Sequence, residues 1–339
     1  MFQRILVPLD GSARAEHAIP VAIRLARASG GTIVFVHIVH PSTKIGAYGA
    51  EDEAMGVPPS VYEKHLTEAE HYLRQVTHTY ASDLMGVHVK QEVETGATAE
   101  TLFSLARLEQ IDIMVLCSHG THDLFHRIFR SFSREAVHHS PVPILLLNEA
   151  GKLFLADQSD HPLRMLVPLD GSHLAEEALQ PALQLLTALA APGQGEVHLA
   201  QVVDLPSIEG KTLLKAYAIK SAQEQAMQEA DQYLQEAMQR LSAAIPADAH
   251  LTVTSSTVVS THVAHTIARM VEPLEEGEHP YDLLAMATHG RTGLQRLTMG
   301  SVTERVLSAT HLPLLVVRPS QPAGAQEQEL AASVKGEQA

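Results

Sequence analysis

The sequence predicts an α/β fold in two tandem domains, each built on a five-stranded parallel sheet. Two observations carry this prediction. Short apolar runs alternate with longer amphipathic stretches, a pattern that is typical of βαβ crossovers. The pattern also occurs twice, in units of roughly 150 residues, which is the size of a domain with its own core and far longer than a solenoid repeat.

The repeat is visible in three pairs of matching segments. Arg4–Ser12 (RILVPLDGS) returns as Arg164–Ser172 (RMLVPLDGS), with an Ala-Glu pair at the same offset beyond each. The other two pairs are residues 111–120 with 281–290 and residues 143–147 with 313–317. Chance does not explain such agreement, so the chain contains two copies of one unit.

Within the first unit, strands are expected where apolar residues run together, and helices where they recur every three or four residues. The first helix is expected to end at Gly30 and Gly31, since glycine is typical of helix C-termini. In chain order the predicted elements are strand 5–9, helix 13–29, strand 32–39, helix 60–80, strand 87–94, helix 99–109, strand 113–117, helix 131–138 and strand 144–147. The second unit follows the same order, with a longer helix rich in Ala, Gln and Glu at about 213–244.

Composition shifts mark the expected domain boundaries. Residues 150–162 are polar and rich in Asp, which suits a linker, and residues 320–339 are rich in Gln, Glu, Ala and Gly, which suits a disordered tail. The predicted domains are therefore 1–149 and 163–319.

The charge balance excludes several classes of function. The formal net charge is −15 and the isoelectric point is near 5.7, so clustered cations for a nucleic-acid backbone or an anionic membrane are absent. The sequence contains no apolar run of 18 residues and no secretory leader. The single cysteine excludes an internal disulfide. These features predict a cytoplasmic protein without nucleic-acid or membrane partners.

The most informative local pattern is a strand, a glycine loop and a helix start in the second unit. Met286-Ala287-Thr288-His289-Gly290 follows an apolar run, and Gly300-Ser301 opens a helix whose Glu304 completes the S-x-x-E spacing of a capping box. Glycine lets the backbone approach an anion, and the N–H groups of a first helical turn favour phosphate oxygens. The pattern indicates a nucleotide, while the alternative is a tight, well-capped turn without a ligand.

Together, the V-P-x-D-G-S opening, the T-H-G-R-T-G-L loop and the G-S-V-T-E-R-V helix start resemble the universal stress protein family in its tandem form. The resemblance covers most of the chain. It implies doubly wound, Rossmann-like domains of the adenine nucleotide alpha hydrolase-like type, with helices on both faces of each sheet. A subset of the family binds ATP through a G-x-x-G-x9-G-(S/T) motif after the fourth strand, where open α/β sheets place ligands.

Carried over to this chain, the resemblance puts Pro168 and Asp170 beside the adenosine and Val202 at the adenine. It places Met286, Ala287 and Gly290 along the ribose and phosphates, and Gly300, Ser301, Val302 and Thr303 at the phosphate tail. Leu169 and Arg291 complete the predicted set, although an arginine in a loop is more often solvated. The first motif glycine is replaced by Ala287.

Asp170 has two interpretations from its own chemistry. Its carboxylate suits ribose hydroxyls or Mg²⁺ at the end of a strand, so the cofactor is expected to be ATP with or without Mg²⁺. The alternative is a turn aspartate that bonds the backbone of Gly171 and Ser172.

The first unit departs further from the motif. Its counterparts to the ATP residues are Asp10, Cys117, Gly120, Arg130 and Ser131, so a side chain occupies the position of the close-approach glycine. Arg134 stands where a capping box requires Glu. Arg130 can instead meet a phosphate as a fork donor, but the simpler expectation is that this unit has lost ATP binding.

The sequence contains 21 histidines, but their spacing gives little support for a metal site, and the loops give little support for catalysis. His119, His122, Asp123 and His126 cluster in one loop, and His262 and His265 lie one turn apart, but neither group matches a zinc signature. No P-loop lysine and no nucleophile elbow are present, so neither a metal site nor a catalytic residue is predicted.

Three functions remain open at this stage. The first is an ATP-binding stress or signalling module acting on an unidentified protein partner, and the second is a ligand-free protein-interaction module. The third is a slow ATPase. In each case the two units are expected to pack as an intramolecular pseudo-dimer through 143–147 and 313–317, because their edges would otherwise be unpaired. A homodimer of the whole chain stays open.

Overall fold

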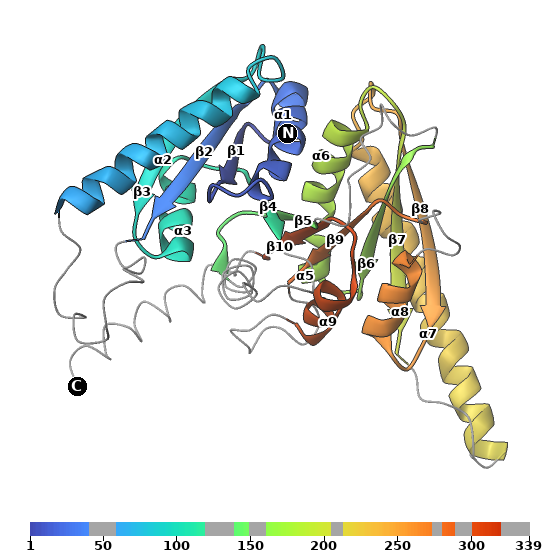
Figure 1. The fold of residues 1–339 in the computed structure, drawn as a ribbon. Helices are drawn as coiled ribbons and strands as arrows, with labels where there is room; N and C mark the ends of the chain where they lie inside the picture. The colour runs from blue at the N-terminus through green and yellow to red at the C-terminus, as the bar shows by residue number, and fades with distance from the viewer. Residues whose placement is uncertain are drawn as a thin grey trace, which may run out of the picture.

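A computed structural model describes residues 1–40, 59–118, 139–148, 161–204, 213–272, 280–288 and 300–319. Ten strands form one sheet in the order β3-β2-β1-β4-β5-β10-β9-β6-β7-β8 (Figure 1). The first five strands in this order come from the first half of the chain and the last five from the second. Each half thus contributes the predicted five strands.

The first half follows the predicted order of elements. It contains β1 Arg4–Pro8, the 3₁₀ helix η1 Ala15–His17, α1 Ala18–Ser29, β2 Thr32–Val39, α2 Pro59–Thr79, β3 His88–Thr95, α3 Thr98–Leu108, β4 Ile113–Ser118 and β5 Ile144–Asn148. The helix predicted from residue 13 starts instead with a separate 3₁₀ turn. Gly30 follows α1 with a φ of 65°, as expected for a glycine at a helix end. The helix predicted at 131–138 lies outside the described residues.

The second half repeats this order, and its long helix α7 has 31 residues against 21 in α2. It contains β6 Leu163–Leu169, α5 His173–Glu176, α6 Leu179–Ala190, β7 Gly195–Val203, α7 Leu213–Ala243, β8 Leu251–Val259, α8 Val263–Val271, β9 Leu283–Ala287, α9 Ser301–Ala309 and β10 Leu314–Val317. Most of the predicted linker 150–162, and the whole tail 320–339, fall outside the described residues, so these boundaries stay predictions.

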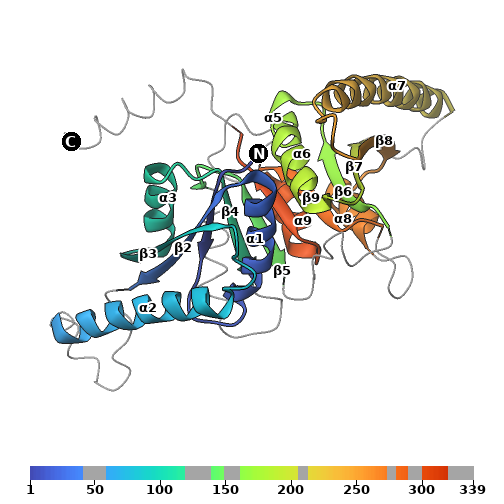
Figure 2. The ribbon, with the colours of Figure 1, turned by 90° about the horizontal axis from the view of Figure 1, so that it is seen from above.

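Helices cover both faces of the sheet, as Figure 2 shows for α2 and α3 around β2 and for α7 and α8 around β7. Ile5 and Val7 of β1 enter a core with α1, α2, α6 and α7, whereas Leu6 enters a second core with α3 and α8. Strands buried on both faces have continuous apolar sequences, which is why the strand pattern was readable.

The two halves join through their last strands, and this confirms the predicted pairing of these two strands. Strands β5 and β10 run antiparallel, with Leu145 opposite Leu315 and Ile144 opposite Val316. Every other strand pair that the structure describes is parallel. Helices α1 and α6 also contact each other, so a single core spans both halves.

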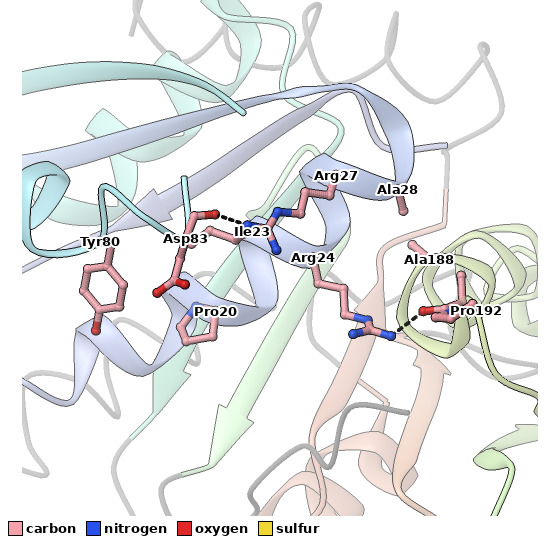
Figure 3. A pocket seen from close by; sticks show the side chains of 10 residues that line it. Pro20, Ile23, Arg24, Arg27, Ala28, Tyr80, Asp83, Ala188 and Pro192 are labelled. Carbon is pink, nitrogen blue, oxygen red and sulfur yellow. Dashed lines mark hydrogen bonds between the residues drawn. The ribbon is translucent and has the colours of Figure 1, made fainter. Parts of the chain in front are cut away.

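One arginine crosses this seam. The Arg24 Nε donates a hydrogen bond to the Leu189 carbonyl oxygen at 3.1 Å, and its Nη2 bonds the Ala191 carbonyl (Figure 3). Both acceptors lie at the C-terminal end of α6, where a cation is favoured by the helix dipole. Beside it, Arg27 Nη2 donates to the Asp83 carbonyl at 2.5 Å. These arginines line a shallow groove between α1 and α6.

Candidate functional site

The end of β9 and the start of α9 are fixed to each other by two hydrogen bonds, and a third joins the end of β9 to β10. The Gly300 N–H donates to the Thr288 carbonyl at 2.8 Å, and the Thr303 hydroxyl donates to the Ala287 carbonyl at 3.0 Å. The Thr288 N–H in turn donates to the Val317 carbonyl of β10 at 2.8 Å. The helix start therefore has a defined position at the carboxyl edge of the sheet.

The predicted capping box at this helix is wrong. Gly300 is the N-cap, with φ −59° and ψ 139°, and Ser301 is already the first helical residue. The bond from the Gly300 N–H to Thr288 holds the glycine in this extended conformation, so the helix begins one position earlier than the S-x-x-E spacing requires. A glycine N-cap offers no side-chain acceptor to the N–H groups of the first turn.

The reason for glycine at position 300 is space. A Cβ atom at this position would lie 3.2 Å from the Thr288 carbonyl oxygen, closer than an ordinary contact. The negative φ by contrast suits any residue. A side chain at position 300 would thus crowd the strand end without straining the backbone dihedral angles.

The other predicted residues of the second half lie at the same edge of the sheet. Strand β6 lies between β9 and β7, and all three run parallel. Pro168 and Leu169 are buried at the end of β6, and Asp170 follows them. Val202, near the end of β7, packs against the same core as Met286 of β9. Val302 of α9 packs against this core as well. Gly290 and Arg291 lie outside the described residues.

Asp170 has the turn role that was one of its two interpretations. Its Oδ1 accepts the Ser172 N–H at 2.9 Å, and Gly171 between them has a φ of 80°, which glycine adopts readily. In the first half, Asp10 accepts the Ser12 N–H at the same distance of 2.9 Å. The aspartate therefore shapes the turn in both halves, whether or not a ligand is bound.

The counterparts in the first half are only partly described. Cys117 is buried in β4 and pairs with Leu147 in the register of the sheet. Gly120, Arg130 and Ser131 lie outside the described residues, as do Arg134 and the histidine cluster at 119–126. In the second half, His262 precedes α8 and its ring contacts the Thr261 hydroxyl at 2.8 Å. Within the described ranges, no three potential metal ligands gather.

Sequence reasoning missed a polar network on the neighbouring strands. Glu196 and His198 alternate on β7, and Thr252, Thr254 and Ser256 alternate on β8. Such alternation at a period of two is the signal for one shared face of a sheet, and it was present in the sequence.

The geometry defines a tandem, doubly wound α/β protein with a glycine-led helix at the carboxyl edge of its second half. Comparison with known proteins gives the family: the chain matches the universal stress protein family over residues 1–148 and 163–318, and it belongs to that family.

Two relatives resemble the chain along nearly its whole length. A universal stress protein of Mycolicibacterium smegmatis is 24% identical over 323 residues, covering 93% of this chain and 97% of the relative. The universal stress protein E homolog of Haemophilus influenzae is 22% identical and covers 94% and 98%. Both are thus similar to the complete tandem arrangement.

A solved structure has the same fold. The crystal structure of a universal stress protein from Archaeoglobus fulgidus superimposes with a TM-score of 0.57 at 18% identity, over 94% of this chain and 97% of that one. Among the described helices, none combines the length and apolar character that crossing a membrane requires.

Proposed function

We propose that this universal stress protein is a cytoplasmic stress-response or signalling module that binds one ATP in its second half. The observation that carries the proposal is the Gly300 N-cap, which is bonded to the end of β9 and brings no side chain of its own to the start of α9. The N–H groups of such a helix start, together with the helix dipole, favour phosphate oxygens.

The adenosine side of this proposed site is built by neighbouring strands. Pro168, Leu169 and Asp170 come from the end of β6, Val202 from β7, and Met286 and Ala287 from β9. Ala287 and Thr303 help to position the start of α9, because the Thr303 hydroxyl donates a hydrogen bond to the Ala287 carbonyl. Asp170 places a carboxylate at the end of β6, a group whose chemistry suits a ribose hydroxyl or Mg²⁺.

Nucleotide is held in this proposal and not rapidly turned over, because the sequence contains no P-loop lysine. ATP binding then sets the conformation of residues 291–299 and, through them, a surface for a protein partner. The test is calorimetric titration of the intact protein with Mg-ATP, with and without chelator. One site per chain is expected. Two comparable sites would overturn the assignment to the second half.

The second candidate is a ligand-free interaction module. It is favoured by the hydrogen bonds that already occupy Asp170 Oδ1 and the Thr303 hydroxyl. Extraction of small molecules from the freshly purified protein separates the two candidates. An adenine nucleotide in the extract supports the first, whereas an empty extract together with a flat titration supports the second.

A further inference from the structure

Five polar side chains form a continuous hydrogen-bonded chain across β6, β7 and β8. Arg164 Nε donates to Glu196 Oε2 at 3.0 Å, and the Thr254 hydroxyl donates to Glu196 Oε1 at 2.7 Å. His198 Nδ1 lies 2.8 Å from Thr254 Oγ1, and His198 Nε2 lies 2.8 Å from Ser256 Oγ. The ring of His198 thus links the Ser256 hydroxyl, through Thr254, to the carboxylate of Glu196, which Arg164 also contacts.

Sheet register brings these residues together. His198 lies opposite Thr254 and Ala200 lies opposite Ser256 in the parallel pairing of β7 with β8. Because residues two apart share a face of a strand, Thr254 and Ser256 both reach the ring of His198 from the same side.

The direction of each hydrogen bond follows from the number of protons available. The single hydroxyl proton of Thr254 is donated to Glu196, so Thr254 accepts at its other contact. His198 must therefore carry its proton on Nδ1, which leaves the lone pair on Nε2. The Ser256 hydroxyl donates to that lone pair. This is the polarity of a nucleophile that is bonded to its general base.

The charge state of the histidine is consistent with this arrangement. Burial lowers the pKa of His198 below its ordinary value, and the nearby Arg164 lowers it as well, while Glu196 opposes them. A neutral imidazole is the form that accepts a proton at neutral pH. Arg164 is itself held over the ring of Tyr281, at 5.3 Å from its centre.

We propose that Ser256 is a nucleophilic serine that accepts an acyl group from an activated ester, with His198 as its general base. The Ser256 Oγ forms a bond to the carbonyl carbon as the ester C–O bond breaks. The hydroxyl proton passes to His198 Nε2 and then to the departing alcohol oxygen. Acyl-serine and free alcohol are the products, so no further reactant is needed.

The reactive group is accessible and separate from the proposed nucleotide site. Ser256 and His198 are half-buried and Thr254 is exposed, so a small ester can approach from solvent. His198 precedes Val202 by four residues on β7, a distance of about 13 Å along a strand. Ester chemistry at Ser256 therefore does not depend on ATP binding.

The described strands of the first half hold no equivalent chain. Arg4 corresponds to Arg164 in the repeat, and the matching strand positions carry other chemistry. In place of Glu196, His198, Thr254 and Ser256 the first half has Thr32, Val34, Lys90 and Glu92. The assignment is thus specific to the second half.

The test treats the full-length protein with p-nitrophenyl acetate and, separately, with a fluorophosphonate probe, and locates the label by peptide mass spectrometry. One acetyl group per chain from the ester, or one phosphonyl group from the probe with release of fluoride, is expected on Ser256. Replacement Ser256→Ala abolishes the label, and His198→Gln slows labelling roughly 100-fold, the usual contribution of a general base. The matched control is Ser255→Ala, which removes a hydroxyl from the opposite face and leaves the rate unchanged.

A second measurement stays informative if a variant folds poorly. Nitrogen NMR of the unmodified protein is expected to show His198 protonated on Nδ1 and unprotonated on Nε2. Thr254→Val removes the acceptor of the Nδ1 proton and shifts this tautomer ratio. Label confined to lysines, equal labelling in Ser255→Ala and Ser256→Ala, or a proton on Nε2 in the native protein would each overturn the proposal.

Discussion

The two halves of this universal stress protein share their framework and differ in their polar side chains. Each begins with the same Asp-Gly-Ser turn, and each carries a glutamate just beyond that turn beneath the long helix. In the first half, Tyr72 of α2 donates to Glu16 Oε1 at 3.1 Å. In the second, Arg240 of α7 bonds Glu176 at 2.8 Å, beside the half-buried Tyr233.

The difference is sharpest on the outer strands. In the first half, Lys90 of β3 forms ion pairs with Glu92 at 2.7 Å and with Glu109 at 2.8 Å. In the second half, the same face holds the chain from Glu196 through His198 to Ser256. Residues common to the halves therefore build the turn, the strands and the seam. Gly300 and the chain that ends at Ser256, by contrast, occupy positions where the halves differ.

The largest expected effect comes from copying a residue of the first half into the second. Replacing Gly300 with Arg, as at Arg130, is expected to abolish ATP binding, because a side chain at the N-cap occupies the space that phosphate needs. A labelled ATP analogue measures the affinity. Some stability is lost too, since the new Cβ lies 3.2 Å from the Thr288 carbonyl oxygen.

Two comparisons make this experiment decisive. Thermal melts followed by circular dichroism show whether the Gly300→Arg protein is folded, and a folded protein with unchanged affinity would mean that phosphate does not bind at this helix start. The reverse swap, Arg130→Gly, is not expected to create a site, because Cys117 and Arg134 remain in the first half.

The seam between the halves gives the next largest effect. Leu315 is fully buried in β10 opposite Leu145 of β5. Leu315→Ala is expected to lower the free energy of unfolding by about 2–5 kcal/mol, the usual cost of a cavity in a core. Leu108→Ala is the control, since that side chain is 79% exposed and its loss should change stability by less than about 0.5 kcal/mol.

Calorimetry of the same variant tests whether the seam couples the halves. Both halves of the wild-type chain are expected to unfold in one transition, because one core includes residues from each. If Leu315→Ala leaves the midpoint unchanged, or if the wild-type halves already melt separately, the seam contributes little to stability.

The smallest effect is a pH dependence shared by the halves. Burial lowers the pKa of His37 in the first half and of His198 in the second. The unfolded chain then binds protons more readily, so the free energy of unfolding falls as the pH drops below about 6.5. Chemical denaturation at pH 7.5 and 5.5 measures the change. His37→Gln and His198→Gln should each reduce the change in the free energy of unfolding between these two pH values. An equal change in the wild-type protein and both variants would contradict this assignment.

Sequence patterns predicted the strands and the seam because both depend on continuous apolar residues. Leu145 and Leu315 lie in strands that are buried on both faces, and such strands can be recognised in the sequence as continuous apolar runs. The N-cap of α9 could not be predicted in the same way. Its position depends on the hydrogen bond from the Gly300 N–H to the Thr288 carbonyl, which joins residues on either side of a loop.

The network on β7 and β8 was missed for a related reason. His198 and Ser256 are separated by 58 residues, and only the lateral register of the two strands brings them together. Alternating polar residues indicated the shared face, but the pairing of individual side chains depends on the register.

Because β5 and β10 belong to one chain, the formation of their antiparallel contact does not depend on protein concentration. Two separate copies would need a concentration above their dissociation constant to form this seam, whereas one chain holds its halves at a high effective concentration that dilution does not alter. A pair of identical copies must also carry every substitution twice. A single chain can place Arg130 on one side and Gly300 on the other while the leucines of the seam stay matched. Covalent linkage thus lets the two sides of a symmetric interface acquire different tasks.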